Sequence, residues 1–214
     1  MTPDTPQDQF IEQFPTLLLH RRFTDNAALN NELAALVRKM QDTTANAAAG
    51  SSTYGGYQTD TNFLYMENTA VKALQQLIRA TLQIYLPRFF RAELSSAPKS
   101  VDARLWGWAV LMQAGDYNTP HVHPDAHISG VYYVEVPAIV GESREDRMGG
   151  SLTFYDPRPG AEMYQIRCRR IQHNVTPQPG DLVMFPSYHR HAVFPFRCAG
   201  ERISVAFNAR LTVE

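Results

Sequence analysis

The C-terminal half of the chain is a series of short apolar runs separated by turn-forming residues, and this pattern restricts the fold most strongly. In the first of these runs, LWGWAVLM (105–112), Trp106 and Trp108 share one face, and we expect them to pack against helices. Short runs rich in β-branched and aromatic residues, bounded by Gly, Pro, Asp and Asn, are typical of a β-sandwich or barrel. The runs are LWGWAVLM (105–112), ISGVYYVEV (128–136), GSLTFY (150–155), DLVMFPS (181–187) and RISVAFNARL (202–211).

The N-terminal part has a different periodicity, which predicts helices. Apolar residues recur at helical spacing between residues 29 and 40, after the candidate cap residues Thr24 and Asp25. A second helix is expected to begin after Asn68 and to end at Pro87, because proline lacks the N–H that a helix interior requires.

Length and composition favour a single structural domain. The chain has 214 residues, of which 44% are hydrophobic and 19% charged, with a formal net charge of −1. We expect residues 1–100 to form a helical extension that packs on a β core of residues 101–214. The near-neutral charge gives no reason to expect a nucleic-acid partner.

No feature of the sequence points to a membrane or to an oxidising compartment. No apolar run approaches the roughly 18 residues that a membrane span needs, and the N-terminus lacks the pattern of a signal peptide. We therefore expect a cytoplasmic protein with no membrane partner, in which Cys168 and Cys198 are free thiols rather than a disulfide. The oligomeric state stays open, with a homodimer among the alternatives.

Five of the seven histidines fall in two short clusters, one around residues 121–127 and the other at residues 189–191. In an extended chain, His121 and His123 project from the same face and can present imidazoles to one point. His191, at the end of a later apolar run, is the natural third donor. Imidazole suits iron, copper, zinc and nickel. The alternative is a histidine-rich surface loop that holds no metal.

The last apolar run carries a second signal. Arg202 and Ser204 share one face of the expected strand, while Ile203, Val205 and Phe207 occupy the other. An arginine on the inward face of a barrel is costly unless an anion meets it, and its guanidinium matches a carboxylate in shape. The alternative is an ion pair with a structural Asp or Glu.

Taken in order, these motifs resemble those of the iron(II)- and 2-oxoglutarate-dependent oxygenases. The stretches HVHPDAHISGVYYV, GSLTFYDPR, FPSYHRHAV and RISVAFN follow one another as in a group of uncharacterised bacterial and phage proteins of that superfamily. The resemblance covers roughly residues 104–210. It implies a mainly β fold with flanking helices, namely the double-stranded β-helix, a cupin-like jelly-roll barrel.

The resemblance also implies an activity and a metal site. Such a protein would be a non-haem dioxygenase that uses Fe(II) and the cosubstrate 2-oxoglutarate to hydroxylate a substrate, here an unknown small molecule or protein. The implied metal ligands are His121, His123 and His191, with no catalytic residue beyond them. His123 stands where the family has a carboxylate, so a shifted triad of His123, Asp125 and His191 is the alternative.

The cosubstrate site follows from the same resemblance. Arg202 would hold the C5 carboxylate of 2-oxoglutarate, with Ser204 and Tyr133 as additional hydrogen-bond donors. For Tyr133, an ordinary core aromatic is the alternative.

Two other classes of function remain open. One is a cupin-type metalloprotein with three histidines that does not use 2-oxoglutarate, since Gly115 and the HxH motif reproduce the start of the cupin pattern. In that class Arg202 has no role. The other is a barrel that binds a ligand or partner without catalysis. The small, Gly-containing segment 45–58 is either a lid over the site or a plain connector.

Overall fold

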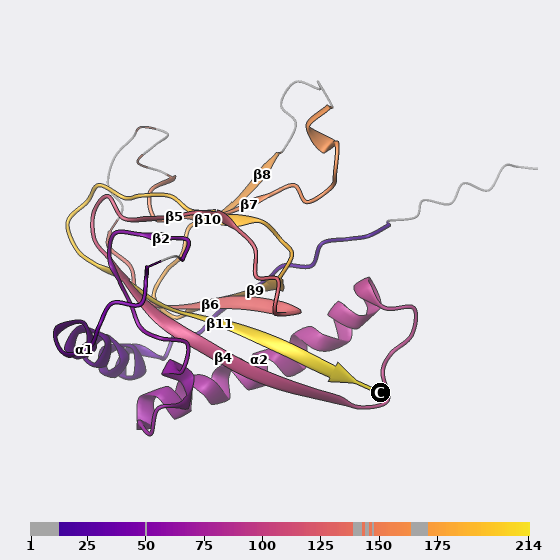
Figure 1. Ribbon diagram of the computed structural model, residues 1–214, viewed down its shortest axis with the longest axis horizontal. Coiled ribbons are helices and arrows are strands. Elements are labelled where there is room, and N and C mark those ends of the chain that lie inside the picture. The colour runs from indigo at the N-terminus through magenta and orange to yellow at the C-terminus, as the bar shows by residue number, and fades with distance from the viewer. Residues whose placement is uncertain (1–12, 50, 139–142, 144–145, 147, 164–170) are drawn as a thin grey trace, which may run out of the picture.

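The computed structural model describes residues 13–49, 51–138, 143, 146, 148–163 and 171–214. Within these residues the chain forms two antiparallel sheets that face each other, as in a jelly-roll barrel (Figure 1). The larger sheet has the order β1 (Leu19–Arg22), β9 (Asp181–Pro186), β6 (Ile128–Glu135), β11 (Arg202–Val213), β4 (Val101–Met112), β3 (Tyr57–Gln58). The smaller sheet has the order β2 (Thr53–Tyr54), β5 (Tyr117–His121), β10 (His191–Val193), β7 (Leu152–Tyr155), β8 (Gln172–Val175). This arrangement is a double-stranded β-helix, which confirms the predicted fold class.

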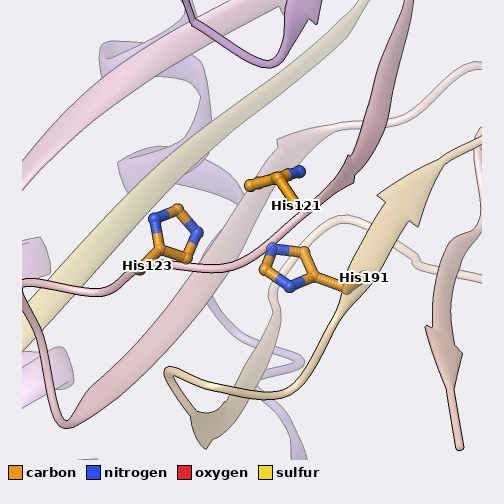
Figure 2. Close-up of side chains that lie close together, drawn as sticks. All are labelled: His121, His123 and His191. Carbon is orange, nitrogen blue, oxygen red and sulfur yellow. The ribbon is translucent and has the colours of Figure 1, made fainter. Parts of the chain in front are cut away.

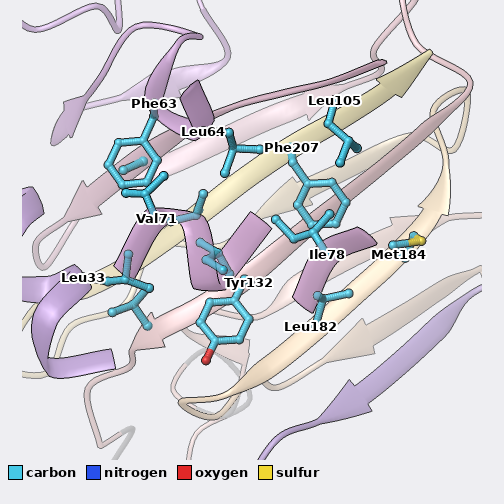
Figure 3. Packing of buried hydrophobic residues seen from close by; sticks show 14 of the residues in the cluster. Leu33, Phe63, Leu64, Val71, Ile78, Leu105, Tyr132, Leu182, Met184 and Phe207 are labelled. Atoms are coloured by element: carbon cyan, nitrogen blue, oxygen red, sulfur yellow. The ribbon is translucent and has the colours of Figure 1, made fainter. Parts of the chain in front are cut away.

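Two helices cover the outer face of the larger sheet. Figure 1 shows α1 (Ala27–Thr43) and α2 (Thr69–Glu93) on the side of β4 and β11 that faces away from the smaller sheet. Short 3₁₀ turns lie at Phe63–Tyr65 and Ala161–Met163. The apolar faces of the helices meet one face of the sheet in a continuous core (Figure 3), which includes Leu33, Val71, Leu74, Ile78, Leu105, Tyr132, Leu182, Ile203, Val205 and Phe207.

The start of α2 confirms the prediction from sequence, and its end does not. The side chain of Asn68 accepts hydrogen bonds from the backbone N–H groups of Ala70 and Val71, which caps the helix. Pro87, however, lies inside the helix, which continues to Glu93. Pro87 is exposed, so the carbonyl that it leaves without a helical partner lies on the solvent side, while Phe89 and Phe90 beyond it are buried in the core. The free energy gained by burying Phe89 and Phe90 therefore outweighs the free energy that Pro87 costs the helix.

The N-terminal part contains strands as well as helices. β1 pairs with β9. The short segment β2–turn–β3, called the hairpin below, places its first strand beside β5 in the smaller sheet and its second beside β4 in the larger one. Gly55 and Gly56 form the turn of this hairpin at φ values of 71° and 64°, which glycine adopts most readily. The hairpin thus bridges one open side of the barrel. The helix α1 begins at Ala27 after Asn26, slightly later than Thr24 and Asp25 suggested.

Two other predictions concern the chain as a whole. Within the described residues, no helix combines the length and the hydropathy that crossing a membrane requires. Cys198 is a half-buried free thiol, whereas Cys168 lies outside the described residues.

Candidate metal and cosubstrate site

The two histidine clusters of the sequence come together at one end of the smaller sheet. His121, the last residue of β5, pairs across the ladder with His191, the first residue of β10. His123 follows two residues after the end of β5, and Figure 2 shows the three imidazoles turned toward one another. One possible ligand atom from each residue lies within 4.8 Å of the others. The ring centroids of His121 and His191 are 4.3 Å apart.

Backbone carbonyls fix the orientation of two of these rings. The Nδ1 atom of His121 lies 2.7 Å from the carbonyl oxygen of Thr119, and the Nδ1 atom of His191 lies 2.9 Å from that of His189. Because a carbonyl only accepts, each Nδ1 carries the proton and donates it. The lone pair of each ring is then on Nε2, which is the arrangement that a metal-binding histidine needs.

Burial keeps the three imidazoles neutral. It lowers the pKa of His121, lowers that of His123 to about 4 with a contribution from the nearby His121, and lowers that of His191 well below its usual value. At neutral pH all three rings therefore offer a lone pair and carry no charge. The cluster fits a divalent metal of the iron-to-zinc series.

Asp125 and His127 belong to the same stretch of sequence but lie outside the histidine cluster. Asp125 is exposed in the turn after His123, and the described histidine and acidic residues that could share a metal do not include it. His127 is also exposed, and its Nδ1 accepts a hydrogen bond from the backbone N–H of Leu211. The structure therefore brings together the HxH set rather than the shifted set with Asp125.

A cavity of about 300 Å³ extends from the histidines into the barrel, and Arg202 lies in it. Arg202 is only 2% exposed, and its Nη1 donates to the hydroxyl of Ser204 at 3.3 Å. The guanidinium carbon lies 4.9 Å from the ring centre of Tyr133. Within the described part of the chain, no carboxylate lies within salt-bridge distance of Arg202, so the predicted alternative of a structural ion pair is not found.

Two buried polar atoms at this place lack a hydrogen bond among the described residues: the Nε of Arg202 and the hydroxyl of Tyr133. Burial raises the pKa of Tyr133, and the adjacent guanidinium only partly offsets this, so the phenol stays protonated and able to donate. A buried cation beside an unused donor is costly unless an anion completes the site. The residues present therefore fit a carboxylate.

The guanidinium of Arg202 and the three histidines lie at different positions along the length of the barrel. Trp108 lies 5.8 Å from His123, ring centre to ring centre, and pairs with Ala206 in β11. Ala206 is four residues beyond Arg202, which corresponds to roughly 13 Å of extended strand. The cavity can thus hold a small extended molecule with one end at the histidines and a carboxylate at the arginine.

The prediction that Trp106 and Trp108 pack on the helices is wrong. Trp108 lines the cavity, and Trp106 shares its face of β4, whereas the odd-numbered Leu105, Ala109 and Leu111 belong to the helix-side core. Sequence reasoning also missed Thr53, Gln58 and Asn118, which line the same cavity. For Asn118 the available signal was its place three residues before His121. The composition of the hairpin gave no such signal for the other two.

A second, larger hollow meets the cavity at Val122 and His123. It has a volume of about 610 Å³ and is lined mostly by apolar side chains from the end of α2 and the end of β11, including Phe90, Leu94 and Leu211. The metal-ligand cluster is therefore bordered by a hollow that suits an apolar molecule.

Comparison with known proteins agrees with this picture. Residues 107–208 match a protein family described as "Putative 2OG-Fe(II) oxygenase". The fold resembles a prolyl-4-hydroxylase from Pseudomonas putida, with a TM-score of 0.57 at 18% identity over 90% of this chain and 91% of that one. None of the curated protein sequences matches the chain.

Two further solved structures share the fold. The non-haem α-ketoglutarate-dependent epimerase SnoN from nogalamycin biosynthesis has a TM-score of 0.58 at 16% identity, covering 92% of this chain and 80% of that one. HygX from Streptomyces hygroscopicus, solved with nickel and 2-oxoglutarate, has a TM-score of 0.52 at 13% identity, covering 91% and 83%.

Residues 107–208, just under half of the chain, match the family "Putative 2OG-Fe(II) oxygenase", and this segment lies within a double-stranded β-helix. The match agrees with the superfamily that the sequence motifs resemble.

Proposed function

We propose that this protein is a dioxygenase that couples the oxidative decarboxylation of 2-oxoglutarate to the hydroxylation of a substrate. One observation carries the proposal: Arg202 is buried with no carboxylate partner among the described residues, in the same cavity as three converging histidines. The cupin alternative accounts for the histidines but gives the arginine no role.

His121, His123 and His191 would hold the iron. With 2-oxoglutarate and dioxygen, the bound iron supplies the oxidising power of the reaction. The protein contributes position and environment: the carbonyls of Thr119 and His189 orient two of the rings, and burial keeps all three neutral. Because the three side chains are neutral, they would not offset the charge of a divalent ion, and the site would favour an anionic cosubstrate.

Arg202, Ser204 and Tyr133 would hold the far carboxylate of 2-oxoglutarate. The guanidinium supplies the charge and a planar pair of donors, and the two hydroxyls complete the hydrogen bonds of the carboxylate. This assignment gives a partner to Nε of Arg202 and to the hydroxyl of Tyr133, two buried atoms that have none among the described residues. Both ends of the cosubstrate are then fixed by groups that the fold already holds in place.

The product of the reaction depends on more than the barrel. Proteins of the same fold include a prolyl-4-hydroxylase and an epimerase, so the barrel alone does not select the product. We propose hydroxylation because it is the usual outcome of the oxygenase class.

The test is purification without chelator, followed by metal analysis and calorimetry with 2-oxoglutarate. We expect stoichiometric iron and a binding signal that disappears in Arg202→Ala, while the metal content of that variant stays unchanged. Binding that is equal in wild type and Arg202→Ala would remove the oxygenase proposal and leave the cupin alternative.

A second comparison tests the metal ligands. We expect His123→Ala to lose iron and Asp125→Ala to keep it, because only the former side chain lies in the cluster. The opposite result would show that the ligand set is the shifted one.

A further inference from the structure

Polar residues that have not been assigned so far also line the cavity, and three of them, Thr53, Gln58 and Asn118, are hydrogen-bonded to one another. Thr53 and Gln58 come from the β2–β3 hairpin, which precedes the segment that matches the oxygenase family. The hairpin bridges the two sheets, so its side chains reach the interior from the open side of the barrel. Neither the metal site nor the arginine site uses them.

Gln58 lies in the same transverse row of the larger sheet as two residues of the arginine site. It pairs with Val110 of β4, Val110 pairs with Ser204 of β11, and Ser204 pairs with Tyr133 of β6. Directly paired residues in antiparallel strands point to the same face of the sheet. All four line the cavity, and Arg202 is the next inward residue along β11.

Hydrogen bonds fix which end of the Gln58 amide is engaged. The amide nitrogen of Asn118 donates to the hydroxyl of Thr53 at 2.9 Å, and that hydroxyl in turn donates to the Oε1 of Gln58 at 2.9 Å. The backbone N–H of Gln58 donates to Asn46 Oδ1 at 3.0 Å, which holds the strand in place. The remaining group is Nε2, a donor that has no hydrogen bond within the described residues.

We propose that Gln58 is a further cosubstrate-binding residue, whose Nε2 donates a hydrogen bond to the carboxylate that Arg202 holds. The inference rests on the proposed function and adds a residue from outside the matched segment. Gln58 lines the cavity and is only 8% exposed, so its Nε2 donor is available to a molecule that fills the cavity. A carboxylate held by Arg202 would supply the acceptor for this donor.

The proposal has a structural consequence. Gln58 is tied through Thr53 to β2 of the smaller sheet, while Arg202 belongs to the larger one. A carboxylate bound by both side chains therefore links the hairpin to β11 across the open side of the barrel.

The test replaces Gln58 by two residues that differ in one property. Gln58→Glu keeps the size and the oxygen that accepts from Thr53, but it replaces the donor by a negatively charged oxygen. Gln58→Leu removes both hydrogen bonds. The measurement is calorimetric binding of 2-oxoglutarate to each protein loaded with manganese, which needs no turnover.

We expect 2-oxoglutarate to bind roughly tenfold more weakly to Gln58→Leu, the loss of one hydrogen bond to a charged group. Gln58→Glu should bind more weakly still, because its carboxylate repels the ligand or occupies Arg202 itself. Thr53→Val is the matched control: it removes the bond to Oε1 and leaves Nε2 in place, so its affinity should change by less than that of either variant.

A purely structural role for Gln58 predicts the reverse pattern. Gln58→Glu would then bind like wild type, and Gln58→Leu would match Thr53→Val; either result overturns the proposal. Thermal unfolding without ligand checks that each variant is folded. Loss of binding in Arg202→Ala with normal binding in Gln58→Glu rejects only the role of Gln58, whereas absence of binding in wild type rejects the proposed function as well.

Discussion

Tyr132 and Tyr133 are neighbours in β6 and both are fully buried, yet their hydroxyl groups are in opposite situations. Tyr132 faces the helices, where it donates to Asn30 Oδ1 at 2.7 Å and accepts from Asn26 Nδ2 at 3.1 Å (Figure 3 shows its place in the core). Tyr133 faces the barrel, and its hydroxyl has no partner among the described residues. Folding thus satisfies the hydroxyl of Tyr132 and leaves that of Tyr133 available.

The same contrast runs along β11. Ile203, Val205 and Phe207 pack against the helices, whereas Arg202 and Ser204 face the cavity. An unpartnered buried donor costs free energy, and the cost is greatest when the group is charged, as Arg202 is. The unpartnered groups of Arg202 and Tyr133, which lie together in one cavity, therefore indicate a ligand. Three experiments test the difference between the two faces.

The largest expected effect concerns packing. Leu74→Ala, on the helix side, should lower the free energy of unfolding by an amount near the upper end of roughly 2 to 5 kcal/mol, because Leu74 is fully enclosed. Leu152→Ala, at the cavity wall, should cost an amount near the lower end, since truncation there enlarges an existing space. Urea denaturation measures both, and equal losses would contradict the distinction.

The next effect concerns pH in the metal-free protein. The pKa of His123 is lowered to about 4 from 6.5 by burial, so below pH 6.5 the unfolded chain takes up a proton that the folded protein does not. The free energy of unfolding should therefore fall as the pH drops from 6.5 to about 4, by about 3 kcal/mol from this residue. In His123→Asn the fall should be correspondingly smaller. A pH dependence identical to that of wild type would mean that His123 is not buried in solution.

The smallest effect compares the two tyrosines directly. Tyr132→Phe should lower the free energy of unfolding by about 1 to 2 kcal/mol, because it leaves Asn30 and Asn26 without their buried partner. Tyr133→Phe should leave the stability of the ligand-free protein almost unchanged and weaken 2-oxoglutarate binding instead. Thermal denaturation and calorimetry separate the two quantities. A marked loss of stability in Tyr133→Phe would show that its hydroxyl has a partner within the protein.

The strands with regular apolar patterns were the predictable part of the fold. β4, β6, β7, β9 and β11 all lie within or around the predicted runs, because long alternating or wholly apolar segments leave few other structures open. β5 was not predicted, since YNTPH is polar and contains Pro120. β10 has only three residues, too few for a pattern. Both strands are held by their neighbours in the sheet rather than by their own composition.

The candidate site was predictable to the extent that its residues belong to motifs. The six predicted residues all line the same cavity: His121, His123, His191, Arg202, Ser204 and Tyr133. Gln58 and Thr53 could not be found in this way, because they reach the cavity from a hairpin whose composition is that of an ordinary loop. Their position depends on which sheet each strand of the hairpin joins.

The sequence by itself determined which residue types face which side of each long strand, because side chains alternate with a period of two and the apolar set must be buried. It thereby separated Arg202 from Ile203 and placed the histidines at strand ends. Only the tertiary structure decided that two remote strand ends meet, that no described acid pairs with Arg202, and that the hairpin closes the barrel with Gln58 inside. These are contacts between segments far apart in the chain, and no local pattern specifies them.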